Sequence, residues 1–188
     1  MKTKKLFVLL FLTFLILYPF NYALSATTQI NLPSTTAEGI FLLDNRTNKI
    51  LYSRSENKKM YPASTTKILT AIIVLENCNL NDVVSASYNA VMSIPNGYST
   101  ADIQIGEELT VEQLLELLLV CSANDAANVL AEYVGGSIDS FVSMMNTKLN
   151  ELSLTDSHFT NAFGMQDENH YTTAHDLAFI MKYCLKND

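Results

Sequence analysis

The first half of the chain carries short apolar segments bounded by turn residues. Residues 39–43 and 49–52 are mostly apolar and β-forming, and residues 44–48 between them are rich in Asp and Asn. Apolar segments around such a turn predict a β-hairpin. Residues 80–87 and 103–105 predict further short strands. Residues 90–102 contain Pro95, Asn96 and Gly97 and predict mostly loop.

Five segments have apolar residues at the spacing of a helix: 68–76, 111–120, about 126–134, the segment after Ser137, and 174–186. In the fourth, the recurring apolar positions predict core packing; they are Phe141, Met145, Leu149 and Leu152. The ends carry capping signals: a Thr110–Gln113 capping box, a Gly135-Gly136 stop, Ser137, and Thr172 or Thr173. The 111–120 helix is apolar on three sides, so we expect it at the centre of the core.

The N-terminus has the pattern of a secretory signal peptide. Three lysines precede a 13-residue, mostly apolar run, Leu6–Tyr18, and small residues follow up to Ser25 and Ala26. The run is short for a membrane span. We expect residues 1–26 to be a signal peptide cleaved after Ser25 or Ala26, with an uncleaved signal anchor as the alternative. Residues 27–37 predict a polar spacer, and residues 38–188 the folded domain.

Composition and charge narrow the range of partners. Of the 188 residues, 48% are hydrophobic and 16% charged, which is typical of one folded domain with a sizeable core. Without residues 1–26 the chain keeps nine Lys and Arg against 19 Asp and Glu, a net charge of −10. Nucleic acids and anionic lipid surfaces are therefore poor partners, and we expect an extracytoplasmic partner that is small, mobile or cationic.

The cysteine spacing indicates neither a zinc motif nor a dense disulfide framework. The chain has three cysteines, Cys78, Cys121 and Cys184, and the last two have apolar neighbours. We expect them to be buried thiols. One disulfide among the three stays an alternative.

The histidines do not form a ligand cluster in the sequence. His158, His170 and His175 lack both H-E-x-x-H and the i, i+4 spacing of helical metal ligands. They predict side chains at the surface or in loops. No serine lies in G-x-S-x-G, so a Ser-His-Asp triad has little support. We expect no metal and no cofactor.

A serine and a lysine stand one helical turn apart in Pro62-Ala63-Ser64-Thr65-Thr66-Lys67. Residues i and i+3 share a helix face, so the Ser64 hydroxyl and the Lys67 amine can meet at the helix N-terminus, where unpaired N–H groups favour negative charge. These are the parts of an acylating serine. The alternative is a plain N-cap, and the same spacing recurs in the polar segment Ser55–Lys58.

A second polar group, Ser122-Ala123-Asn124, interrupts the helical region. A hydroxyl and an amide two residues apart in a non-helical break can both point into a cleft. The alternative is a helix–helix turn in which Ser and Asn cap the next helix. Ser87-Tyr88-Asn89 shows the same spacing elsewhere.

The two motifs, in this order and 58 residues apart, resemble those of the penicillin-binding D-alanyl-D-alanine carboxypeptidases, the low-molecular-mass serine peptidases of cell-wall maturation. The resemblance runs from about Gly39 to the C-terminus and includes residues 44–52, Gly135-Gly136 and residues 158–165. It implies an α/β (α+β) fold of the DD-peptidase and β-lactamase type, with a helical region packed on an antiparallel sheet. It also implies action in the cell envelope.

The resemblance implies a role for each residue. Ser64 would attack the carbonyl of the penultimate D-Ala of a peptidoglycan stem peptide. Lys67, kept neutral by burial and neighbouring positive charge, would accept the serine proton. Ser122 would relay a proton to the leaving amine, and Asn124 would hold Lys67 and the substrate amide. Water would hydrolyse the acyl-enzyme, and β-lactams would acylate the same serine.

One part of the family pattern is not found in this sequence. Relatives carry K-T-G on a strand that follows the helical region and binds the substrate carboxylate, whereas here neither K-T-G nor H-T-G occurs. We therefore expect a fragment or a truncated gene product with an incomplete catalytic domain, without the C-terminal amphipathic membrane anchor usual in relatives.

Two other functions stay open. A class A β-lactamase would need a deacylating glutamate, but residues 158–165 contain none, and Glu151 and Glu168 lack a convincing context. The other alternative is a truncated, non-catalytic exported relative that binds peptidoglycan without turnover. The missing K-T-G is the main support for it.

Overall fold

The computed structural model describes residues 34–186. Of these, residues 37–186 belong to one compact unit. The predicted signal peptide and most of the predicted spacer lie outside the described residues, and the domain boundaries stay a prediction. Residues 34–37 are exposed and have no regular secondary structure. Within residues 34–186, no helix has both the length and the hydropathy needed to cross a bilayer.

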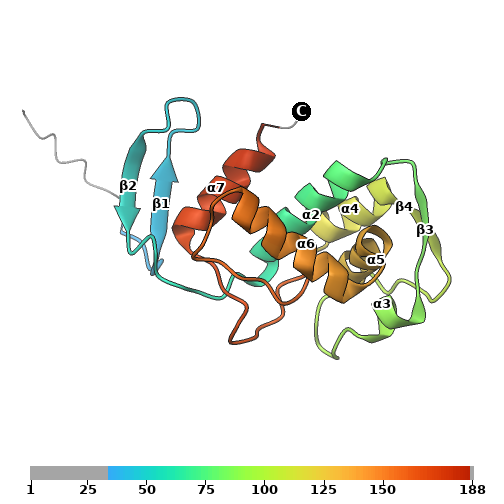
Figure 1. Cartoon of the computed structure of the whole chain (residues 1–188). Helices are drawn as coiled ribbons and strands as arrows, with labels where there is room; N and C mark the ends of the chain where they lie inside the picture. The colour runs from blue at the N-terminus through green and yellow to red at the C-terminus, as the bar shows by residue number, and fades with distance from the viewer. Residues whose placement is uncertain (1–33, 187–188) are drawn as a thin grey trace, which may run out of the picture. The chain divides into compact units, whose positions relative to one another are not determined.

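The predicted hairpin is confirmed, as β1 (Ile40–Leu43) paired antiparallel with β2 (Ile50–Arg54). Its turn is held by Asp44, whose Oδ1 accepts the backbone N–H of Arg46 (3.0 Å) and of Thr47 (2.7 Å). One face of the hairpin packs on α7 (Ala174–Cys184) (Figure 1). Phe41 contacts the ring of His175 there, with 5.1 Å between the ring centroids.

The helical region is built around α2 (Thr66–Asn77), which contacts α4 (Val111–Val120), α5 (Asn124–Gly135), α6 (Ile138–Glu151) and α7 (Figure 1). The expectation that α4 is central is wrong. One face of α4 is buried, but Leu119 and Val120 on its last turn are 56% and 82% exposed. An apolar helix surface is buried only where neighbours cover it, and here α2 and α5 cover one side.

The predicted caps are confirmed. Thr110 and Gln113 form a capping box at α4, and Gly136 ends α5 in the left-handed conformation at φ 73°. Ser137 caps α6, and Thr173 caps α7 by accepting the N–H of Asp176. Each signal is local and needs no tertiary partner, which is why the sequence located these helix ends.

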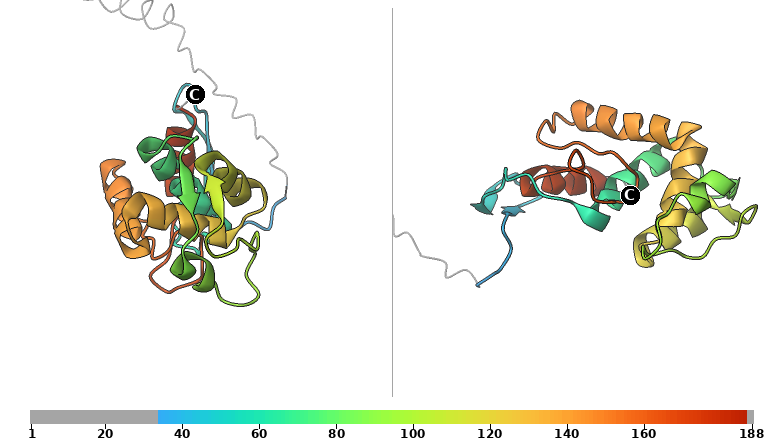
Figure 2. Two further views of the ribbon diagram at one scale, coloured as in Figure 1. Left: turned by 90° about the vertical axis from the view of Figure 1, so that its right-hand side faces the viewer. Right: turned by 90° about the horizontal axis from the view of Figure 1, so that it is seen from below.

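Residues 83–110 differ from the expectation. A second antiparallel pair joins β3 (Val83–Ser85) to β4 (Glu108–Thr110), and the strands lie side by side in Figure 2. The strand predicted at 103–105 is wrong, because the N–H of Ile103 is bound by the Asp125 carboxylate and not by a strand. The loop predicted at 90–102 is wrong at its start, where Ser87 caps the short helix α3 (Tyr88–Met92).

The cysteine expectation is partly wrong. All three cysteines are free; Cys121 is exposed, and Cys78 and Cys184 are half-buried. Cys121 follows the last residue of α4, next to Leu119 and Val120, which are exposed as well. Apolar neighbours in the sequence therefore did not indicate burial at this position.

Candidate active site

The Ser64 hydroxyl lies exposed at the entrance to α2. A 3₁₀ turn, η1 (Ala63–Thr65), carries it, with buried Pro62 before the turn and Ala63 at φ 48°. The residues that cap η1 and α2 are Pro62 and Thr65, and neither start uses a side-chain capping bond. The plain N-cap alternative for Ser64 is therefore wrong, and its hydroxyl is available for other contacts.

Lys67 is buried beneath Ser64, with 2% of its surface exposed. Its Nζ lies 3.4 Å from Ser64 Oγ and donates to Asn124 Oδ1 (2.7 Å) and to the backbone carbonyl of Phe163 (3.0 Å). Both acceptors are uncharged, so no carboxylate bonded to the ammonium offsets its burial. Burial accordingly lowers the pKa of Lys67 to about 8.

This arrangement suits a base. A neutral amine has two N–H groups and one lone pair. If Asn124 and Phe163 take the two N–H groups, the lone pair is left on the side of Ser64. Burial by itself accounts for the lowered pKa of Lys67, and neighbouring positive charge contributes nothing among the described residues. That part of the expectation is wrong for this chain.

Ser122 lies in the break between α4 and α5, with φ 55°, and its Oγ donates to Ser64 Oγ at 3.0 Å. A left-handed backbone is unfavourable for serine, and such strain is concentrated at functional sites. Asn124 is the first residue of α5, and the residue that caps the helix is Ala123, without a side-chain bond. The reading of Ser122 and Asn124 as simple caps is therefore wrong.

The structure thus brings together all four residues that the sequence singled out. They come from two helix starts and one strained break, and they share a chain of contacts from Ser122 through Ser64 and Lys67 to Asn124. The serine of the similar sequence motif, Ser55, lies in the segment after β2 at φ 48° and takes no part in this chain.

Sequence reasoning missed Asp125, which is 1% exposed. Its carboxylate accepts the backbone N–H groups of Ala101 (3.0 Å), Ile103 (3.1 Å) and Ala126 (3.0 Å). It therefore holds the 99–103 segment against the start of α5. The segment in turn contacts the motif, because the N–H of Asn124 donates to the Ser99 carbonyl at 2.9 Å.

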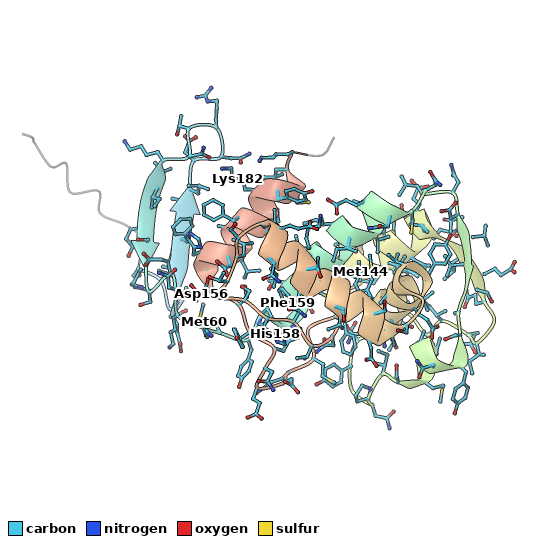
Figure 3. All side chains as sticks on the ribbon, viewed as in Figure 1. Met60, Met144, Asp156, His158, Phe159 and Lys182 are labelled. Atoms are coloured by element: carbon cyan, nitrogen blue, oxygen red, sulfur yellow. The ribbon has the colours of Figure 1, made fainter. Side chains whose placement is uncertain are left out.

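Sequence reasoning also missed the part played by residues 158–171. The segment is a loop, but Phe159, Ala162 and Phe163 are buried in the core. Figure 3 labels Phe159 beside α6, where its backbone N–H and carbonyl both bind the Asn146 side chain (3.0 and 2.8 Å). The signal available in the sequence was the Asn161–Gly164 pattern, to which no role was given.

The histidines do not share one environment. His158 is exposed, and His175 is partly exposed and beside Asp176. His170 lies in a loop, as expected, but its side chain is only 1% exposed and therefore not at the surface. Its burial depends on the packing between α2 and the loop. This packing cannot be inferred from the neighbours of His170 in the sequence.

Comparisons with known proteins agree with this geometry. A family model described as D-alanyl-D-alanine carboxypeptidase matches residues 26–188. The D-alanyl-D-alanine carboxypeptidase DacF of Bacillus subtilis is 36% identical over 155 residues, which cover 80% of this chain and 39% of DacF. A D-alanyl-D-alanine carboxypeptidase of a Streptomyces species is 33% identical over 169 residues, 85% of this chain and 58% of that protein.

Solved structures show the same fold. Penicillin binding protein 5 of Haemophilus influenzae superposes with a TM-score of 0.79 at 28% identity, over 84% of this chain and 47% of that one. A D-alanyl-D-alanine carboxypeptidase of Mycobacterium tuberculosis gives 0.78 at 32% identity, over 86% and 60%. The expected fold class is confirmed. The chain spans between about two fifths and three fifths of the length of these relatives.

Proposed function

The chain belongs to the D-alanyl-D-alanine carboxypeptidase family, and on this premise we propose that it is the acylating part of a serine-type D-alanyl-D-alanine carboxypeptidase. The substrate would be a peptidoglycan stem peptide, and β-lactams would react at the same serine. The observation that carries the proposal is the contact between buried Lys67 and exposed Ser64 at a helix start. The pKa of this lysine is lowered to about 8.

The proposed first step is acylation of Ser64. Neutral Lys67 takes the proton of Ser64 Oγ while Oγ bonds to the carbonyl carbon of the penultimate D-Ala. The backbone N–H of Ser64, in the first turn of the helix, supports the oxygen that becomes negative. The carbon–nitrogen bond then breaks, and a proton passes from Lys67 through Ser122 to the departing amine of D-Ala.

The proposed second step is hydrolysis of the ester. A water molecule loses a proton to Lys67 and attacks the acyl carbon, and Ser64 Oγ leaves with the returned proton. Asn124 has two tasks in this scheme: its Oδ1 fixes the lysine at 2.7 Å, and its amide N–H can bind a substrate carbonyl. We place the reaction outside the cytoplasm, in the cell envelope, in line with the predicted signal peptide.

Covalent labelling tests the proposal. The 188-residue chain is incubated with a fluorescent penicillin, and the modified peptide is mapped by mass spectrometry. We expect a single adduct at Ser64 that disappears in Ser64→Ala and persists in the matched control Ser55→Ala, which removes the serine of the other S-x-x-K segment.

Release of D-Ala from a peptide that ends in D-Ala-D-Ala is measured in parallel. A folded chain that neither forms the adduct nor releases D-Ala contradicts the proposal and favours the non-catalytic peptidoglycan-binding alternative. Rapid turnover of the penicillin without D-Ala release favours a β-lactamase. An adduct that survives in Ser64→Ala would remove Ser64 from the reaction.

A further inference from the structure

The second bond that fixes Lys67 comes from the 158–171 loop, so the position of that loop matters for the base. One face of α2 binds the loop through three successive contacts. Thr66 Oγ1 lies 2.9 Å from His170 Nε2, Lys67 Nζ donates to the Phe163 carbonyl at 3.0 Å, and Thr70 Oγ1 donates to the Ala162 carbonyl at 2.6 Å. The loop is therefore attached to α2 on both sides of the lysine.

The tautomer of His170 follows from its partners. Its Nδ1 accepts the backbone N–H of Thr160 at 3.0 Å, and a backbone N–H can only donate. Nδ1 therefore carries no proton, and in the neutral ring the proton is on Nε2. The Nε2–H then donates to Thr66 Oγ1. The imidazole joins α2 to the loop backbone through both nitrogens.

Asn161 continues this connection to the turn that presents the Phe163 carbonyl. Its Nδ2 lies 3.2 Å from His170 Nδ1 and donates to the Met165 carbonyl at 2.9 Å. Its Oδ1 accepts the N–H groups of Gly164 (2.7 Å) and Met165 (2.8 Å). The imidazole, the Asn161 side chain and the turn are thus linked by hydrogen bonds that are buried or partly buried.

We propose that His170 is a positioning residue for Lys67: a neutral imidazole that ties Thr66 of α2 to the Asn161–Met165 turn and so fixes the carbonyl that holds the lysine. The inference rests on the proposed function, since it assigns Lys67 the task of a base. His170 does not touch Ser64, and its burial keeps it from acting on a substrate directly.

The electrostatics agree with a neutral ring. Burial lowers the pKa of His170 to about 4, with the exposed His158 acting in the same direction and the Asp167 carboxylate opposing it. On α2, Thr66 bonds to His170, and the charged residue nearest to Thr66 in the sequence is its neighbour Lys67. At the pH where Lys67 loses its proton, the imidazole is therefore uncharged and its hydrogen-bond pattern is fixed.

The test measures the titration of Lys67 itself, without substrate. Lysine labelled with carbon-13 at Cε is followed by NMR between pH 6 and 11, and Lys67→Arg identifies the Lys67 signal. We compare the unsubstituted chain with His170→Phe, which keeps a buried ring, and with Thr66→Val, which removes only the hydroxyl partner. His158→Phe is the matched control, an exposed histidine of the same loop.

We expect a Lys67 midpoint near 8 in the unsubstituted chain and in the control. His170→Phe and Thr66→Val should both raise it by about one unit, because a displaced turn admits water to the amine. His170→Gln should raise the Lys67 midpoint by less than His170→Phe does, because its amide can still donate to Thr66. A midpoint that is unchanged or lowered in folded His170→Phe and Thr66→Val overturns the proposal.

A second readout separates this proposal from the function it rests on. If Ser64 is acylated by penicillin, the pH profile of acylation in Thr66→Val should move by the same shift as the NMR midpoint, which is about a tenfold slower rate below pH 8 for one unit. Failure of the unsubstituted chain to react refutes the proposed function, while the NMR comparison still decides the role of His170.

Discussion

At the scale of single residues, the proposed reaction depends on the protonation state of Lys67. Its two bonded oxygens are an amide and a backbone carbonyl, so burial is not compensated by an opposite charge, and the pKa falls to about 8. The nearby Asp125 carboxylate accepts three backbone N–H groups instead of contacting the lysine. The Asp125 side chain thus holds a loop and does not bind the amine.

The first prediction concerns pH. Below about pH 8 Lys67 is protonated and cannot accept the serine proton, so acylation of Ser64 by a fluorescent penicillin should rise with pH through a midpoint near 8. Asn124→Asp places a carboxylate where Oδ1 now lies 2.7 Å from Nζ, which favours the ammonium. The midpoint should then rise by about 1–3 units.

Acylation rate constants measured from pH 6 to 10 check this, with Asn96→Asp as the control. Asn96 is an exposed loop residue, so its variant adds the same charge away from the lysine. Equal midpoints in Asn124→Asp and in the unsubstituted chain would mean that Lys67 is not the group that limits acylation.

At the scale of elements, the site depends on how closely the 161–165 turn approaches the η1 turn. Gly164 has φ 97°, and a Cβ placed there would lie 1.9 Å from the Ala63 carbonyl oxygen. The two backbones can touch only because this residue has no side chain. Phe163 directly precedes Gly164. The contact between the two turns therefore fixes the position of the Phe163 carbonyl, which accepts from Lys67.

The second prediction uses two glycines that share a left-handed backbone. Gly97 has φ 92° and open space around its Cβ position, so Gly97→Ala should cost only the backbone strain, about 1–2 kcal/mol. Gly164→Ala adds a collision with backbone and should cost about 3 kcal/mol or more. It should also slow acylation by about 100-fold, since small displacements of a reacting group have large effects.

Urea unfolding of both variants, together with their acylation rates, checks the second prediction. If Gly164→Ala and Gly97→Ala behaved alike, the close approach of the two turns would have no energetic importance. A Gly164→Ala variant that stays folded but reacts slowly would support the argument most directly, because stability and geometry would then be separated.

At the scale of the whole molecule, the buried polar groups connect the helical region to the loop that completes the site. His170 bonds α2 and the loop, and buried Asp176 at the start of α7 accepts from Ser157 at 2.7 Å. Phe159, Ala162 and Phe163 anchor the loop in the hydrophobic core, and these hydrogen bonds add to that packing. Their loss should therefore loosen the site and the fold together.

The third prediction is a dependence of stability on acid. The pKa of His170 is about 4 in the folded chain and ordinarily near 6.5, so between these values the unfolded chain binds a proton that the folded chain does not. The free energy of unfolding must fall as pH falls through this window, by on the order of 3 kcal/mol at most. His170→Gln removes this contribution.

Urea unfolding at pH 7 and pH 4.5 measures this contribution of His170 to the free energy of unfolding. The decrease in unfolding free energy between the two pH values should be smaller in His170→Gln than in the unsubstituted chain, whereas the exposed-histidine control His158→Gln should keep most of the decrease, because burial is the main cause of the lowered pKa of His170. The same decrease in all three chains would show that His170 is not buried in its neutral form.

The sequence alone determined the features that depend on local physics. The hairpin, the capped starts of α4, α6 and α7 and the stop at Gly136 follow from turn and cap chemistry within a few residues. The pairing of Ser64-x-x-Lys67 with Ser122-x-Asn124 was also visible there. The tertiary structure alone decided that Ser64 is not a cap, that α2 and not α4 is central, that Cys121 is exposed and His170 buried, and that the Phe163 carbonyl holds the lysine. These outcomes depend on contacts between residues that lie 58 to 104 positions apart in the sequence, and a local pattern carries no information about such contacts.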